Sequence, residues 1–263
     1  MTNISLIFDE GPIARCYLQT LKRLNCNIEN IIYLGSNIPI LKNILFYLNN
    51  IKQNSFAINF LSNDKNILKI EKIENQFNLG KDFFINSYLK NDFEKLSYVN
   101  SKSVNSENFF NLINNSSGDF FLNTSKQIYK RLNFKDNKKI IHVHPAYLPD
   151  IRGADGSLWS IKILNKFSSS AFLMNNEIDT GQILFREKLD IKKLALFNNL
   201  NSIDLIKFWF SFIDPAIRCH NLFTVLKKEI NLDSIDNDII KGKYYSFMDF
   251  DKKVSVINEI ICN

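Results

Sequence analysis

The N-terminal residues constrain the fold most strongly, because they alternate between strand and helix patterns. Residues 4–8 are a short apolar run typical of a buried strand, and residues 28–34 are a second one. Between them, residues 13–24 carry apolar side chains at helical spacing, preceded by Pro12, which suits a first helical turn. Two strands joined by one helix form a βαβ unit of about thirty residues. Such a unit predicts a parallel sheet.

The alternation of strand and helix patterns continues along the chain. Helical spacing recurs at residues 37–48 and 106–114, and residues 55–61 form a further apolar run. Later segments with strand patterns lie at residues 119–122, 140–144, 170–174 and 183–187. Alternating strands and helices bury their apolar faces in layers, so we predict an α/β fold built as a three-layer sandwich.

The pattern changes beyond about residue 195. Residues 202–226 predict a long helix rich in aromatic side chains, and residues 243–250 form a short aromatic segment. This tail is shorter than the ~100 residues of a typical independent domain. We therefore predict one main domain at residues 1–195 and a C-terminal helical and aromatic extension of it at residues 196–263.

Composition and charge limit the classes of partner. The net charge of +6 comes largely from Lys in short scattered groups, which is typical of a solvated surface rather than of a nucleic-acid site. The four Cys have no C-x-x-C or metal-finger spacing, and no segment approaches the ~18 apolar residues of a membrane span. The first residues also lack the features of a signal peptide. We expect a cytoplasmic protein with no membrane or nucleic-acid partner.

Proton-transfer chemistry is concentrated in one tripeptide. Histidine occurs three times in 263 residues, and two of the three are His142 and His144. On a strand, residues i and i+2 point to the same side, ~6.6 Å apart. The pair would lie at the C-terminal strand end, where open parallel sheets bind ligands. The loop that follows contains Pro149, Arg152 and Gly153, and suits contact with a small polar ligand.

A carboxylate in a second loop, Asp179, completes the predicted constellation. Two neighbouring imidazoles disfavour double protonation, whereas Asp179 would favour the protonated form of the imidazole beside it. One neutral His and one carboxylate-paired His suit acyl transfer, with a donor for the oxyanion and an acceptor for the nucleophile's proton. His142, His144 and Asp179 also match a facial metal triad. A metal-dependent hydrolase or lyase is therefore the alternative.

Two sequence blocks carry a resemblance to a known family. HVHPAYLPDIRGADGSLWSI at residues 142–161, followed by SSAFLMNNEIDTGQIL at residues 169–184, resembles the core of the folate-dependent formyltransferases. That family includes the glycinamide ribonucleotide, methionyl-tRNA and nucleotide-sugar formyltransferases. Its pattern is Asn-x-His-Pro-Ser-Leu-Leu-Pro, an Arg-Gly loop, and Asp-Thr-Gly. The matching residues are His144, Pro145, Leu148, Pro149, Arg152, Gly153, Asp179, Thr180 and Gly181.

The resemblance implies a fold, a formyl donor and residue roles. The fold would be Rossmann-like with a mostly parallel sheet, residues 1–195 would be the catalytic domain, and the donor would be N10-formyltetrahydrofolate. His144 would polarise the formyl carbonyl, and Asp179 would orient or charge that His or relay protons. Arg152 would contact substrate or anchor its loop. The implied cofactor-binding residues are Leu122, Asn123, Thr124, Asn175, Asn176, Glu177 and Ile178.

One departure from the family pattern concerns catalysis. The family's catalytic Asn falls at His142 here. An Asn offers an amide N–H to the oxyanion, and a neutral His can offer one ring N–H instead. The departure leaves two readings open: a working formyltransferase, or a folate-binding homologue with altered or lost transfer.

The substrate class follows by exclusion within the family. The loop after the first strand reads Asp9-Glu10-Gly11-Pro12, which is acidic and suits a phosphate poorly. The tail is short compared with the tRNA-binding barrel of the methionyl-tRNA enzymes, and the basic charge is diffuse. We therefore expect N-formylation of a small, nucleotide-linked amino sugar. The aromatic segment 243–250 suits either a homodimer contact or burial of the tail.

Overall fold

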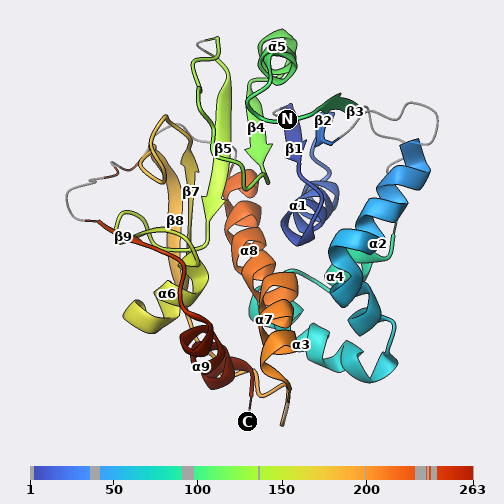
Figure 1. Ribbon diagram of the computed structural model, residues 1–263, viewed down its shortest axis with the longest axis vertical. Helices are drawn as coiled ribbons and strands as arrows, with labels where there is room; N and C mark the ends of the chain where they lie inside the picture. The colour runs from blue at the N-terminus through green and yellow to red at the C-terminus, as the bar shows by residue number, and fades with distance from the viewer. Residues whose placement is uncertain are drawn as a thin grey trace.

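The computed structural model describes residues 3–35, 42–90, 98–135, 137–198, 200–228, 235, 237 and 242–262. Its elements alternate between strands and helices over most of the chain (Figure 1). In chain order they are β1 (Ile4–Phe8), α1 (Pro12–Arg23), β2 (Ile28–Leu34), α2 (Lys42–Leu61), η2 (Asp64–Asn66), α3 (Ile67–Gln76), α4 (Phe83–Tyr88), β3 (Tyr98–Ser101), α5 (Glu107–Asn115), β4 (Phe120–Asn123), β5 (Lys139–His144), β6 (Ile151–Gly153), α6 (Gly156–Leu164), β7 (Lys166–Leu173), β8 (Ile183–Asp190), α7 (Ser202–Phe208), η4 (Trp209–Ile213), α8 (Asp214–Lys227), β9 (Lys243–Tyr245) and α9 (Phe250–Ile261).

A seven-stranded sheet in the order β3-β2-β1-β4-β5-β7-β8 forms the centre of the molecule. The five strands from β3 to β5 pair in parallel, whereas β7 and β8 pair antiparallel. The prediction of an α/β fold with a mostly parallel sheet is confirmed. The pairing at this edge of the sheet is antiparallel because the chain turns back through β6 and α6 between β5 and β7.

Helices cover both faces of the sheet, as the three-layer prediction requires. On β1, Leu6 packs into the core cluster that contains side chains of α1 and α8, whereas Ile7 packs into the cluster that contains α5. On β5, Val143 likewise faces the first cluster and Ile140 the second. Successive strand residues point to opposite faces, so His142 and His144 lie on the α5 side of the sheet.

Local signals explain where the helices begin and bend. Pro12 begins α1, where its missing N–H costs nothing. The Ser106 hydroxyl caps α5 by accepting a hydrogen bond from the backbone N–H of Phe109. The apolar run at residues 55–61 belongs to α2, which bends at Asn54. Of the helix predicted at residues 37–48, residues 37–41 lie outside the described part of the chain.

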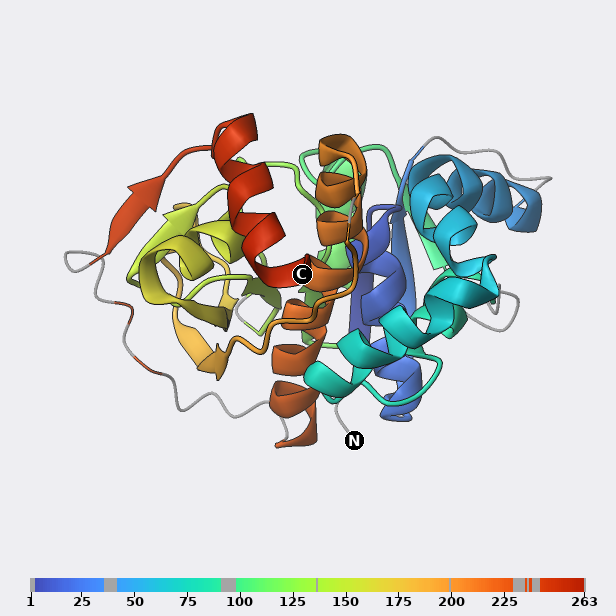
Figure 2. The same cartoon turned by 90° about the horizontal axis from the view of Figure 1, so that it is seen from below.

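The C-terminal segment forms part of the same core as the sheet. Helices α7 and α8 are joined by η4, a single stretch of π-helix, and this rod runs between α1 and α6 (Figure 2). Trp209, Phe212 and Ile217 on the rod are fully buried. Across the described ranges, no helix is both long and apolar enough to cross a membrane.

Candidate functional site

The two histidines lie at the C-terminal ends of neighbouring parallel strands. β4 ends at Asn123 and β5 ends at His144, and the two strands pair in parallel. The structure brings Asn123, His142 and His144 together on one sheet face. The loop that contains β6 and the loop that contains Asp179 then reach them from the side.

His142 is held by one polar neighbour and one aromatic neighbour. The Asn123 Nδ2 lies 3.2 Å from its Nδ1. The Phe172 ring meets the imidazole edge to face at 5.7 Å between centroids. Burial, followed by the positive charge of Arg218, lowers the pKa of His142 to about 3. The ring is therefore neutral at pH 7.

His144 lies between a carbonyl and a carboxylate. Its Nε2 is 3.2 Å from the Ile151 carbonyl oxygen, and its Nδ1 is 3.7 Å from the Asp179 carboxylate. The ring packs so closely on α6 that a Cβ at Gly156 would lie 3.0 Å from it. Burial lowers the pKa of His144, and the negative charge of Asp179 opposes that decrease. The carbonyl and the carboxylate can both only accept, and the carbonyl is the closer of the two, which favours the proton of the neutral ring on Nε2 and leaves Nδ1 beside Asp179.

Asp179 is oriented by the backbone around it. Its carboxylate accepts a hydrogen bond of 2.8 Å from the Gly153 N–H, and its own φ is 56°. Asn237 donates to the carbonyls of Asp179 and Gly181, at 3.2 and 2.8 Å. The loop that contains Asp179 is therefore hydrogen-bonded to two segments that are distant in sequence, at Gly153 and at Asn237. These contacts hold the carboxylate beside His144.

The predicted substrate loop, which contains Pro149, Arg152 and Gly153, is held by contacts within the protein. The Arg152 guanidinium donates to the Gly242 carbonyl at 3.4 Å, which ties β6 to the segment before β9. The Gly153 N–H is used by Asp179, and Pro149 is buried. Of the two roles open for Arg152, the contacts in this structure are those of a loop anchor.

The two predicted cofactor segments differ in what they leave available. Leu122 is fully buried in the core, and Asn123 and Thr124 make internal hydrogen bonds. In contrast, the segment after β7 is exposed: Asn175, Asn176, Glu177 and Ile178. Only the second segment offers open surface to a ligand.

Sequence reasoning missed a largely buried ion pair beneath β5. Arg218 on α8 donates to the Val143 carbonyl, between the two histidines, and its Nε lies 2.7 Å from Asp214. Asp214 accepts a 2.9 Å hydrogen bond from Ser157, the residue after the glycine that touches His144. The sequence does contain a signal for this ion pair, because an Arg and an Asp stand four residues apart on a predicted apolar helix.

The acidic loop after β1 is partly neutralised by its own helix. Glu10 accepts two hydrogen bonds from Arg15, at 2.9 and 2.7 Å. Asp9 accepts a 3.1 Å hydrogen bond from Ser125. The excess negative charge that disfavours a phosphate at this loop therefore rests mainly on Asp9.

The described residues give the metal alternative no support. Among them, no group of three or more His, Cys, Asp or Glu side chains is arranged to hold a metal ion. His142 Nδ1 faces Asn123, and the Nε2 of His144 faces a backbone carbonyl. One nitrogen of each ring is therefore engaged by a neutral amide or carbonyl group of the protein.

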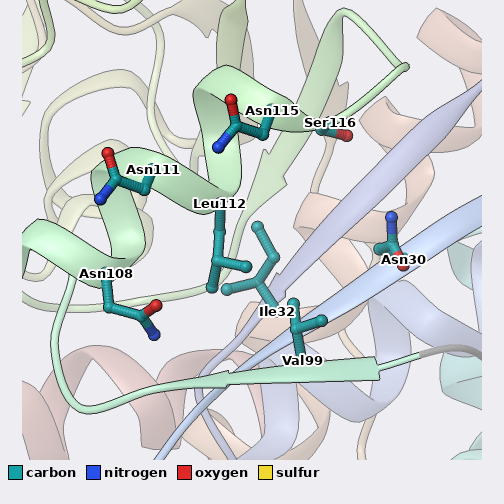
Figure 3. Close-up of a pocket in the computed structure, with 8 residues that line it drawn as sticks. All are labelled: Asn30, Ile32, Val99, Asn108, Asn111, Leu112, Asn115 and Ser116. Atoms are coloured by element: carbon teal, nitrogen blue, oxygen red, sulfur yellow. The ribbon is translucent and has the colours of Figure 1, made fainter.

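A cavity of about 310 Å³ lies apart from these residues, between α5 and the strands β2 and β3. Ile32 and Leu112 point toward each other across it (Figure 3). Its polar lining consists of exposed or half-buried Asn side chains and Ser116. None of the predicted site residues lines this cavity.

The glycine of the Asp-Thr-Gly loop makes a testable contribution to stability. A Cβ at Gly181 would overlap the Leu173 carbonyl oxygen. We expect Gly181→Ala to destabilise the fold by about 1–3 kcal/mol, the typical cost of overpacking, as measured by chemical denaturation. Gly11→Ala is the control, because the nearest atom to its Cβ would be 3.9 Å away. Equal stability of the two variants would contradict the close approach.

Comparison with known proteins relates this geometry to formyltransferases. No protein-family profile matches the chain. A methionyl-tRNA formyltransferase from Finegoldia magna is 26% identical over 168 residues, which cover 62% of this chain and 53% of that protein. The chain thus spans about half the length of this curated relative.

One solved structure supports the same architecture. A sugar N-formyltransferase from a Shewanella species superposes with a TM-score of 0.50 at 17% identity, covering 94% of this chain and 77% of that one. A 4-N formyltransferase from Francisella tularensis gives a TM-score of 0.48 at 15% identity, covering 98% and 86%. The Rossmann-like formyltransferase fold predicted from the two motif blocks is confirmed.

Proposed function

We propose that this protein is an N-formyltransferase that moves a formyl group from N10-formyltetrahydrofolate to the amine of a small, nucleotide-linked amino sugar. The observation that carries the proposal is that the two histidines at the end of β5 use different ring nitrogens. Nδ1 of His142 faces Asn123, whereas Nε2 of His144 faces the Ile151 carbonyl and its Nδ1 faces Asp179. The formyltransferase fold and the likeness to a methionyl-tRNA formyltransferase support it. The scattered positive charge favours a small substrate over tRNA.

His144 and Asp179 suit the role of proton acceptor. N10-formyltetrahydrofolate, when bound, would supply the formyl group, and its N10 would take up one proton, the same proton that the sugar amine gives up. The amine must lose a proton as the new C–N bond forms. The Nδ1 lone pair of His144 can accept that proton, and Asp179 at 3.7 Å stabilises the resulting imidazolium.

His142 suits the role of donor to the developing oxyanion. With its proton on Nε2, a neutral His144 donates to the Ile151 carbonyl, so that N–H is not aimed at a substrate oxygen. We therefore assign carbonyl polarisation to the ring N–H of His142 rather than to His144 as the resemblance implies. Preorganised donors of this kind stabilise a tetrahedral intermediate.

The folate fits one of the two predicted segments better than the other. Leu122, Asn123 and Thr124 are buried and internally bonded, so this segment can offer a ligand only its backbone. Residues 175–178 are exposed next to Asp179. We propose that this exposed loop supplies the main contacts to the pterin.

The decisive experiment tests transfer directly. The purified protein is incubated with N10-formyltetrahydrofolate and a panel of nucleotide-linked amino sugars, and each sugar is examined by mass spectrometry for one added formyl group. Formylation of at least one sugar is expected. Folate binding without transfer to any member of the panel would instead identify a folate-binding homologue.

Substitution of His142 tests the donor role. We expect His142→Ala to lower kcat by about 10²–10³-fold, the cost of one oxyanion donor. His142→Asn should stay within about tenfold of the wild type, because its amide also offers an N–H. Steady-state kinetics on the sugar identified by the panel would measure both. Equal rates for His142→Ala and the wild type would remove His142 from the mechanism.

A further inference from the structure

The side-chain amide of Asn123 has a hydrogen-bond partner at every donor and acceptor position. Its Oδ1 accepts hydrogen bonds from the Ser125 N–H at 3.0 Å and from the Tyr129 hydroxyl at 2.8 Å. Its Nδ2 lies 3.2 Å from the Ser125 carbonyl and 3.2 Å from the Nδ1 of His142. An amide has two donor hydrogens and an oxygen with two lone pairs. All four positions therefore have a partner.

The backbone of Ser125 determines which way this amide points. A flipped amide would place its NH₂ against the Ser125 N–H and its oxygen against the Ser125 carbonyl, which are two repulsive contacts. The backbone groups have no alternative protonation state. The amide orientation is therefore set without reference to His142, and Nδ2 faces the imidazole as a donor.

Tyr129 supports the same orientation. Its hydroxyl is buried and donates to the Asn123 oxygen. Burial, followed by the negative charge of Asp9, raises the pKa of Tyr129. The hydroxyl thus keeps its proton and remains a donor, which requires an acceptor at Oδ1 of Asn123.

We propose that Asn123 is a positioning residue that sets the ring tautomer of His142, so that Nδ1 accepts and Nε2 carries the hydrogen that is offered to the substrate carbonyl. This inference rests on the proposed function for its catalytic consequence, but the tautomer itself does not. In the part of the chain that the structure describes, the hydrogen-bond contact of the half-buried His142 ring is made at Nδ1 and none is made at Nε2. The Tyr129–Asn123–His142 series thus ends in a single N–H available to a ligand.

The charged groups around His142 do not reverse this assignment. Arg218 disfavours a second proton on the ring, as does His144 on the same strand, and Asp179 acts in the opposite direction. Burial is the largest cause of the lowered pKa of His142, and together with these charges it keeps the ring neutral at pH 7. A neutral imidazole has one N–H, and Asn123 decides which nitrogen bears it.

The first test reads the tautomer by NMR. Long-range ¹H–¹⁵N correlation spectra of the labelled full chain at pH 7 distinguish protonated from unprotonated ring nitrogens, and His142→Asn assigns the signals. The wild type should carry hydrogen on Nε2 of His142. In Asn123→Asp a carboxylate faces Nδ1 and can only accept, so Nδ1 should become protonated. An Nδ1–H tautomer in the wild type, or the same tautomer in both proteins, would overturn the proposal.

The second test is kinetic. Asn123→Asp should lower kcat by about 10²-fold, as expected for a misdirected oxyanion donor, with KM changed only a few-fold. Asn75→Asp, the same chemical change at an exposed position on α3, should match the wild type. Tyr129→Phe retains the Ser125 contacts that orient the amide and should keep the wild-type tautomer.

A double variant separates positioning from general damage. An amide at position 142 has no tautomer, so Asn123→Asp should cost at least tenfold less in the His142→Asn background than in the wild type. The same loss in both backgrounds would show a structural role only. If the wild type transfers no formyl group, the proposed function fails, while the NMR result still decides the tautomer assignment.

Discussion

His144→Ala is expected to lower the rate of formyl transfer by about 10²–10⁴-fold, the range attributed to a positioned general base. In this structure His144 is the imidazole that has a carboxylate beside its free nitrogen, with Nδ1 3.7 Å from Asp179. Alanine has no atom that can accept the amine proton. The measurement is kcat on the amino sugar identified by mass spectrometry.

Two further variants serve as controls for His144→Ala. His144→Gln can still donate to the Ile151 carbonyl, now 3.2 Å from Nε2 of the imidazole, but it has no basic nitrogen, so it should be as inactive as His144→Ala. His220→Ala removes the third histidine, which lies between the Phe77 carbonyl at the end of α3 and Glu187 on β8. That variant should retain transfer. Full activity of His144→Ala would show that the proton acceptor is misassigned.

Asp179→Asn is expected to reduce kcat by about 10²-fold or more, because the imidazolium formed on His144 loses its counter-charge. The variant should fold, since an amide oxygen can still accept the hydrogen bond that Gly153 donates at 2.8 Å. The exposed Asp64→Asn, the same change on η2, is the control and should be silent.

The pH dependence of Asp179→Asn has a definite sign. Burial lowers the pKa of His144, and the negative charge of Asp179 raises it. Without that charge the pKa of His144 falls further, so the neutral base persists to lower pH. The acid limb of the kcat profile should therefore shift to lower pH while the plateau rate decreases. An unchanged profile with an unchanged plateau would contradict any coupling between Asp179 and His144.

Local patterns predicted the elements of the fold well, because each is set by residues close in sequence. The strand at residues 4–8 and the strand at residues 28–34 match β1 and β2. The helix predicted at residues 106–114 matches α5 within one residue. The antiparallel direction of β7 and β8 carries no local signature, since it depends on how the intervening loop and α6 turn the chain.

The C-terminal segment illustrates the same limit. Its apolar and aromatic pattern predicted a long helix at residues 202–226, which the structure divides into α7, η4 and α8. Nothing in that pattern indicated that Arg218 would reach the carbonyl of Val143 under the two histidines. The two residues are 75 positions apart, and only the packing of α8 on the sheet brings them together.

For the site, the sequence alone predicted the candidate residues and the strand that presents two of them. The spacing of His142 and His144 predicted a shared face because strand geometry is local. Tertiary structure decided which nitrogen of each ring faces what. Asn123 reaches one imidazole from the next strand, and Asp179 reaches the other from a distant loop. A hydrogen-bonding role belongs to a pair of groups in space, so sequence could name the imidazoles but only the fold could give them different roles.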